Sequence, residues 1–161
     1  MFRQSFLVLL FLLLVFASGV AGGGTPLTDL LRNSQSPVMI EAEISQSGKE
    51  MELVAYIKIP SGSHIYSIQQ QDGVIPTNII PAEPQTRFVS KLVESSPLEI
   101  EDQALDKKVL SHKNIFELRR KIQPAPSQLG LVYNFFLHYQ ICDNSVCSLP
   151  VKTPFSASLL N

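Results

Sequence analysis

Cys142 and Cys147 are the only two cysteines of this 161-residue chain, and they are its strongest candidates for chemistry. Four residues separate them, and Asp143-Asn144-Ser145 within that stretch favours a tight turn. Directly opposed residues of a hairpin lie about 4.5–5.5 Å apart at Cα, which suits a disulfide. We therefore expect the two cysteines to face each other across the mouth of a hairpin.

Two roles for this pair stay open from the residues alone. As a structural crosslink, a six-residue loop stabilises the fold by about 2 kcal/mol, against about 4.7 kcal/mol for a 100-residue loop. A small loop at an exposed hairpin tip is thus a weak stabiliser, but it is accessible to an attacking thiolate. The pair is either a redox centre or a structural disulfide that holds a recognition hairpin.

The histidines do not favour a metal site. Structural zinc sites use four ligands, mostly Cys and His. His138 lies four residues before Cys142, about 13 Å away along a strand, so it neither shares a metal with Cys142 nor acts as its base. His64 and His112 are expected on the surface, and Glu101-Asp102 is expected in a solvated loop. No metal and no cofactor other than a redox-active disulfide is expected.

The N-terminus indicates where the cysteines act. One basic residue precedes an unbroken apolar run of eleven residues, Phe6–Phe16, and Gly19 and Ala21 then stand where signal peptidase requires small residues. Eleven residues are too few to cross a bilayer as a helix, which needs about 20. The sequence predicts a cleaved signal peptide over 1–21 and a periplasmic or secreted protein, where disulfides persist. A short membrane anchor is the alternative.

The remaining residues predict one domain without nucleic-acid partners. A flexible leader is expected over 22–37 and a single domain over 38–161, since about 140 residues suffice for one core. Without Arg3, 12 of the 13 basic side chains remain against 14 acidic ones, whereas phosphate binding requires a basic surface. No second apolar run of about 18 residues follows, so we expect the mature protein to be soluble.

Short β-like runs separated by turn residues predict an all-β sandwich, and the chain has eleven prolines. A hairpin turn is expected at Ser47-Gly48, a polar segment over Glu94–Asp106, and a loop around Pro124–Ser127. The expected strands are Val38–Ile44, Met51–Ile59, His64–Gln69, Arg87–Val93, Ile115–Ile122, Leu129–Ile141 and Val151–Leu159.

The longest of these strands has one strongly apolar face. Alternate residues share a face of a strand, so six large apolar residues of this segment are expected in the core. Cys142 has the opposite parity and is therefore expected on the less buried face, within reach of a partner. The six core residues are Leu131, Tyr133, Phe135, Leu137, Tyr139 and Ile141.

The cysteine hairpin resembles a known family. The run Phe136–Cys142, followed by Cys147-Ser148-Leu149-Pro150, is similar to the active-site hairpin of the N-terminal periplasmic domain of DsbD, the thiol:disulfide interchange protein. Ser63–Ile68 and Val74–Ile79 resemble an early strand-loop-strand of that family, and Glu101–Ile122 lies where its cap loop is placed. The resemblance implies an immunoglobulin-like sandwich with a redox hairpin, as a stand-alone relative.

The resemblance also implies a function: a periplasmic thiol–disulfide exchange protein, with Cys147 as the attacking and Cys142 as the resolving cysteine. Leu105 is the candidate cap residue, and Tyr66 and Gln140 are candidate neighbours of the active site. The implied electron donor is a separate membrane thiol conductor or thioredoxin-like protein.

The implied acceptors are disulfide-containing periplasmic proteins, including those of cytochrome c biogenesis. The alternative is a noncatalytic secreted binding module. A more distant alternative is a protein without redox activity that binds a ligand in a cavity near Tyr66 and Thr77.

Overall fold

The computed structural model describes residues 37–71, 73–123 and 132–159. The predicted signal peptide, all but the last residue of the predicted leader, and the predicted Pro124–Ser127 loop lie outside these residues. So do the first three residues of the predicted Leu129–Ile141 strand, among them the expected core residue Leu131, and the domain boundaries stay predictions. Within the described residues, every regular element is a strand. No helix in this part of the chain is long and apolar enough to cross a membrane.

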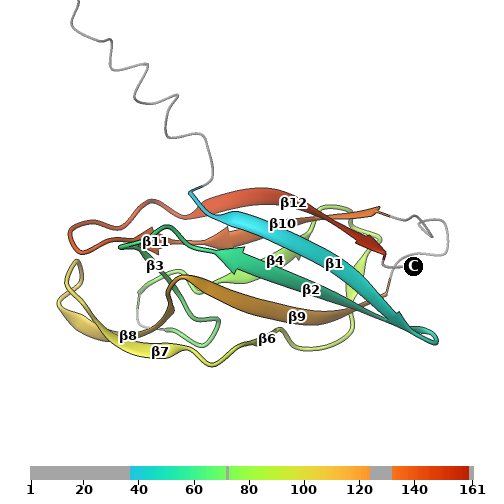
Figure 1. The fold of residues 1–161 in the computed structure, drawn as a ribbon, viewed down its shortest axis with the longest axis horizontal. Helices are drawn as coiled ribbons and strands as arrows, with labels where there is room; N and C mark the ends of the chain where they lie inside the picture. Colours follow the sequence, from blue (N-terminus) through green and yellow to red (C-terminus); the bar gives the residue numbers. More distant parts are fainter. Residues whose placement is uncertain (1–36, 72, 124–131, 160–161) are drawn as a thin grey trace, which may run out of the picture. The chain divides into compact units, whose positions relative to one another are not determined.

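Eight strands form a large sheet in the order β4-β10-β12-β1-β2-β9-β5, with β6 also paired to β9 (Figure 1). The β1–β12 pair is parallel, and the other pairs are antiparallel. The strands are β1 (Met39–Ser47), β2 (Glu50–Lys58), β4 (Asn78–Pro81), β5 (Arg87–Phe88), β6 (Val93–Glu94), β9 (Ile115–Gln123), β10 (Val132–Tyr139) and β12 (Val151–Leu159).

A second, smaller sheet carries the cysteine segment. Its order is β11-β3-β8-β7, and all its pairs are antiparallel. The predicted all-β immunoglobulin-like sandwich is confirmed. The strands of this sheet are β3 (His64–Tyr66), β7 (Leu98–Asp102), β8 (Lys107–His112) and β11 (Ile141–Cys142).

The core follows from the alternation in the sequence. Tyr133, Phe135, Leu137 and Tyr139 of β10 are buried, as predicted, and pack with apolar residues of β1, β2, β9 and β12. The predicted β1–β2 hairpin is also confirmed, and Gly48 in its turn has a φ of 62°, a left-handed conformation that glycine adopts without strain. Burial of these side chains is the main stabilising contribution to the sandwich.

The region between the long strands differs from the prediction. The expected Arg87–Val93 strand is two separate two-residue strands, which both pair with β9. The segment Glu94–Asp106, expected to be polar, contains β7, and neither β7 nor its partner β8 was predicted. The sequence of these strands lacks a clear hydrophobic alternation because β7 is at the edge of the small sheet and carries charged side chains. One of them, Glu99, forms an ion pair with Lys108 at 3.1 Å.

The expected position of Cys142 on the less buried face was also wrong. Cys142 is 1% exposed and belongs to a second apolar cluster with Tyr66, Val74 and Val109. The alternation of β10 does not extend to Cys142 because β10 ends at Tyr139, and the chain then changes from the large sheet to the small one. The alternation of side chains between the two faces of a sheet can be followed only within one continuous strand.

Candidate functional site

The two cysteines form a disulfide at the mouth of a tight hairpin, as the spacing predicted. Their sulfurs are 2.08 Å apart and their Cα atoms 4.0 Å apart, and the two residues form an antiparallel bridge. The hairpin is closed by backbone hydrogen bonds, from Asp143 N–H to the Val146 carbonyl at 3.0 Å and from Ser148 N–H to the Ile141 carbonyl at 2.8 Å.

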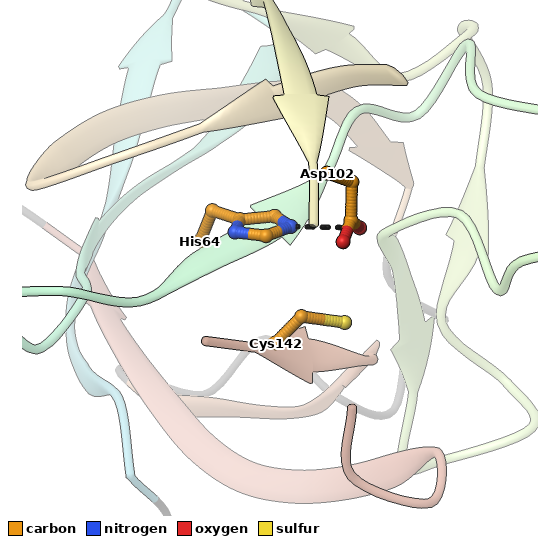
Figure 2. Close-up of side chains that lie close together, drawn as sticks. All are labelled: His64, Asp102 and Cys142. Atoms are coloured by element: carbon orange, nitrogen blue, oxygen red, sulfur yellow. Dashed lines mark hydrogen bonds and ion pairs between the residues drawn. The ribbon is translucent and has the colours of Figure 1, made fainter. Parts of the chain in front are cut away.

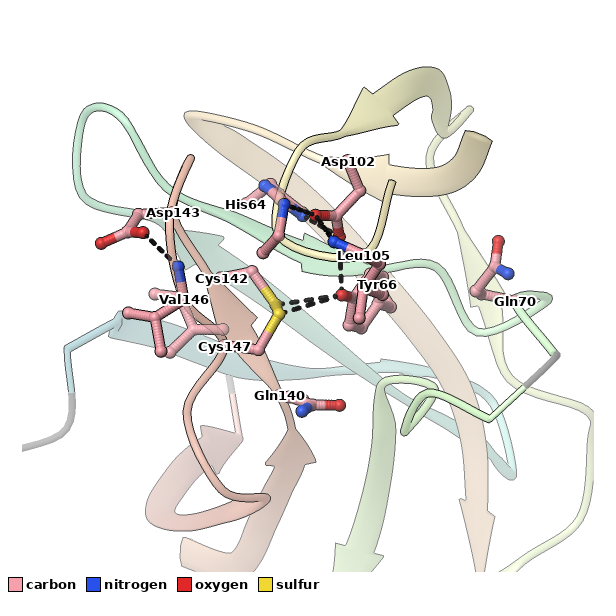
Figure 3. A network of polar contacts seen from close by, with 12 residues as sticks. His64, Tyr66, Gln70, Asp102, Leu105, Gln140, Cys142, Asp143, Val146 and Cys147 are labelled. Carbon is pink, nitrogen blue, oxygen red and sulfur yellow. Dashed lines mark hydrogen bonds and ion pairs between the residues drawn. A yellow bond between two sulfur atoms is a disulfide. The ribbon is translucent and has the colours of Figure 1, made fainter. Parts of the chain in front are cut away.

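Asp143 stabilises the turn between the two cysteines, as expected for an aspartate in a turn. The Asp143 carboxylate accepts the backbone N–H group of Val146 at 2.9 Å (Figure 3). It also accepts the backbone N–H group of Ser145 at 2.7 Å. These two hydrogen bonds lower the pKa of Asp143. Val146, beside Cys147, is largely exposed. The turn therefore holds Cys147 next to an open apolar side chain.

Gln140 anchors the base of the hairpin. Its side-chain amide donates to the Ser148 carbonyl at 3.0 Å and its oxygen accepts the Ile75 N–H at 3.3 Å. The candidate neighbour Gln140 thus joins the hairpin to the loop that precedes β4. Its described hydrogen bonds give it a positioning role.

Tyr66 connects the disulfide to the interior. Strand β3 pairs with β11 so that His64 stands opposite Cys142, and Tyr66, two residues on, projects from the same face. The Tyr66 hydroxyl oxygen lies 3.0 Å from Cys142 Sγ and 3.3 Å from Cys147 Sγ (Figure 3). Tyr66 is fully buried, so the candidate neighbour is a close contact of both sulfurs.

Asp102 is the partner of this tyrosine. Its Oδ2 accepts a hydrogen bond from the Tyr66 hydroxyl at 2.7 Å (Figure 3). It accepts another from His64 Nε2 at 3.1 Å (Figure 2). Its Oδ1 accepts the N–H groups of Ala104 at 2.9 Å and Leu105 at 3.3 Å. The four donors lie around one carboxyl group at the end of β7.

The expectations that placed Asp102 in a solvated loop and His64 on the surface were wrong. Asp102 is 1% and His64 4% exposed. Asp102 is tolerated inside because its carboxylate is fully hydrogen-bonded. The sequence did contain a sign that His64 belongs to the site, because His64 and Tyr66 are two residues apart in an expected strand and so share a face.

The two hydrogen-bonded side chains Asp102 and Tyr66 differ in charge: the carboxyl group is ionised and the phenol is neutral. Burial alone raises the pKa of Asp102, but hydrogen bonds from Tyr66 and His64, the His64 charge and the Ala104 N–H outweigh it, and the pKa is lowered. Burial, with the neighbouring Asp102, raises the pKa of Tyr66. The result is an ionised carboxylate beside a phenol that retains its proton in contact with the disulfide.

Leu105, the candidate cap residue, lies in the turn between β7 and β8. Its N–H donates to Asp102 (Figure 3). Its side chain is 37% exposed. Its role as a cap stays a prediction. Thr77, expected beside a ligand cavity with Tyr66, is buried, and its hydroxyl donates to the Tyr66 carbonyl at 2.5 Å.

A second buried histidine–carboxylate pair lies on the opposite face of the small sheet. His112, also expected on the surface, is 3% exposed, and its Nε2 lies 2.7 Å from Glu94 Oε2. Burial raises the pKa of Glu94, but hydrogen bonds from His112, Ser67, Ile68 and Gln69 outweigh it and lower the pKa. Strand β8 pairs His112 with Ile65, whose side chain points away from the face of His64 and Tyr66.

Comparisons with known proteins agree with this fold. No protein-family model matches the chain, and no curated protein matches it. The N-terminal domain of Neisseria meningitidis DsbD in its reduced form aligns over 79% of this chain and 91% of its own, with 18% identity and a TM-score of 0.49.

The N-terminal periplasmic domain of ScsB from Proteus mirabilis aligns over 76% of this chain with 15% identity and a TM-score of 0.52. The alignment spans 45% of that solved chain. At this identity the likeness is one of fold. The chain thus shares its two-sheet immunoglobulin-like fold with the N-terminal periplasmic domain of ScsB.

Proposed function

We propose that this chain is a thiol–disulfide exchange protein that passes reducing equivalents through Cys142 and Cys147. The observation that supports this most is the contact of both sulfurs with the Tyr66 hydroxyl, 3.0 and 3.3 Å away. A thiolate that leaves Cys142 would have this buried hydroxyl within hydrogen-bond distance as a donor. A buried ionised carboxylate next to the hydroxyl is costly, and a disulfide that serves only as a crosslink does not require it.

The exchange step assigns different parts to the two cysteines. Cys142 is 1% exposed, whereas Cys147 is only partly buried, so an incoming donor thiolate reaches Cys147. The new bond forms at Cys147 Sγ, and the electron pair of the broken S–S bond stays on Cys142 as a thiolate. The second donor thiol then releases Cys147, and the donor leaves as a disulfide. Two electrons and two protons have moved.

Tyr66 acts on the thiolate that leaves. When Cys142 Sγ becomes an anion, the Tyr66 O–H turns towards it from 3.0 Å, while Asp102 retains its bonds to His64, Ala104 and Leu105. A stabilised leaving thiolate departs faster. In the reverse direction, Cys147 attacks the disulfide of an acceptor and Cys142 resolves the mixed disulfide.

The proposal includes partners and a compartment. The donor is a separate membrane thiol conductor or a thioredoxin-like protein, and the acceptors are disulfide-containing periplasmic proteins. The predicted signal peptide and the fold shared with a periplasmic ScsB domain support an extracytoplasmic location. The redox-active disulfide itself is the only cofactor that this chemistry requires.

The redox equilibrium of the purified protein in graded glutathione buffers, followed by thiol trapping and mass spectrometry, tests the proposal. We expect a midpoint between about −180 and −270 mV, the range of exchange proteins. A midpoint below about −300 mV is typical of structural disulfides and would favour the noncatalytic binding module. In that case a partner should bind equally well after both cysteines are changed to serine.

A further inference from the structure

We propose that the reduced chain binds one Zn²⁺ ion through His64, Asp102 and Cys142, with Cys147 as the fourth ligand, and that the disulfide form does not bind it. The inference goes beyond the exchange function. It requires only that the disulfide can be reduced, whether or not a partner protein does so.

The ligand atoms already lie close together. His64 Nε2, an Asp102 oxygen and Cys142 Sγ are all within 4.8 Å of one another (Figure 2). In a tetrahedral zinc site, neighbouring nitrogen and oxygen ligands are separated by about 3.3 Å and nitrogen and sulfur ligands by about 3.6 Å. His64 Nε2 and Asp102 Oδ2 are 3.1 Å apart. The imidazole and the carboxylate thus have nearly the required spacing, and the sulfur must approach by no more than about 1 Å.

The disulfide itself prevents this coordination. Two thiolates on one zinc ion are separated by about 3.8 Å, a separation that sulfurs joined by a covalent bond cannot reach. Disulfide sulfurs also carry no negative charge to offer a cation. Reduction breaks the S–S bond and leaves two thiols, which lose their protons when they bind the metal. Metal binding therefore depends on the redox state of Cys142 and Cys147.

The surroundings suit a bound cation. His64, Asp102 and Cys142 are at most 4% exposed, and the ion would replace the proton that His64 Nε2 and Asp102 Oδ2 share. The Tyr66 hydroxyl donates to Asp102 at 2.7 Å, the kind of contact that orients a carboxylate ligand. Cys147 is partly exposed, so an ion can enter past its side chain.

Zinc binding has a consequence for exchange. Both thiolates would be coordinated, so neither would be free to attack a disulfide or an alkylating reagent. The ion would hold the site in its reduced form and withhold it from partners.

The test uses Co²⁺ as a spectroscopic probe and Zn²⁺ as competitor. The protein is reduced with a phosphine, which is then removed under nitrogen, and Co²⁺ is titrated in. We expect one equivalent to produce thiolate-to-cobalt charge-transfer absorption and the visible bands of a tetrahedral site, and Zn²⁺ to abolish both. The oxidised protein should show neither. In the reduced protein, Zn²⁺ should slow alkylation of both cysteines.

Variants assign the ligands. His64→Gln and Asp102→Asn each keep a hydrogen-bonding side chain but should weaken Co²⁺ binding by about tenfold or more. The matched control is His112→Gln, which changes the other buried histidine–carboxylate pair and should leave binding unchanged. Circular dichroism reports whether each variant is folded.

Absence of thiolate-to-cobalt absorption in reduced wild-type protein would overturn the inference, and so would equal Co²⁺ affinity of the folded His64→Gln and His112→Gln variants. Neither result bears on the proposed exchange, which the glutathione midpoint tests in metal-free buffer. A structural-type midpoint together with cobalt binding would refute the exchange function and retain the metal site.

Discussion

Tyr66→Phe tests the chemistry of the site most directly. The substitution removes one oxygen, the atom that contacts Asp102 at 2.7 Å and the two sulfurs at 3.0 and 3.3 Å. The ring, which fills a fully buried position, stays the same size. If Tyr66 stabilises the thiolate that leaves Cys142, the variant should be reduced more slowly by a thiol.

The magnitude follows from one hydrogen bond to a charged group, which contributes about 1.5–3 kcal/mol. Exchange rates follow the pKa of the attacking thiol with a slope of about 0.4–0.5, and we take the same fraction for the leaving thiol. The barrier should thus rise by about 0.6–1.5 kcal/mol, which is a fall of about 3- to 12-fold in rate. Tyr66 must release Asp102 to reach the sulfur, so we expect the lower part of this range.

The assay is the rate of disulfide reduction by excess dithiothreitol at neutral pH, sampled by thiol trapping. The chain offers a matched control, Tyr139→Phe, because Tyr139 is also fully buried and its hydroxyl lies 3.3 Å from Thr153 Oγ1 in the large sheet. Both variants should lose about 1–3 kcal/mol of stability. Only Tyr66→Phe should react slowly, and equal rates for the two folded variants would refute the role given to the Tyr66 hydroxyl.

Three other expectations concern stability and access. Changing Cys142 and Cys147 together to serine should lower the unfolding free energy by about 2 kcal/mol and abolish exchange; a much larger loss in urea melts would indicate a structural disulfide. Leu105→Ala should speed reduction by dithiothreitol a few-fold if Leu105 shields the disulfide, and an unchanged rate would remove its role as a cap. Folding lowers the pKa of Glu94, so the ionised Glu94 carboxylate stabilises the folded protein above the unfolded-state pKa of about 4.3. This stabilisation is lost as the pH falls through the folded-state pKa. Glu94→Gln should therefore destabilise the protein by about 3 kcal/mol at pH 7 in thermal melts, and the difference from wild type should shrink in acid; a constant difference would contradict the assigned charge.

The strands that build the large sheet could be predicted because their pattern is local. In β10, Tyr133, Phe135, Leu137 and Tyr139 alternate with less apolar residues, and that alternation alone assigns a buried face. The cysteine hairpin was equally accessible, because turn residues lie between the two cysteines. Strands β7 and β8 were missed because β7 is a sheet edge, where burial imposes little pattern on the sequence.

The site itself depends on pairings that no local pattern contains. Tyr66 and Cys142 are 76 positions apart, and Tyr66 and Asp102 are 36 apart. They meet because β3 pairs with β11 on one side and β8 on the other, while β7 adds beyond β8. The sequence shows Asp102 only as one of several acidic residues before a turn, and its burial becomes intelligible once its four donors are known. A charged residue in a polar segment is normally solvated, so its inclusion in a hydrogen-bonded interior is the stronger sign of function. The same register that buries Asp102 places His64 opposite Cys142, and this convergence of imidazole, carboxylate and sulfur is what the proposed metal binding requires.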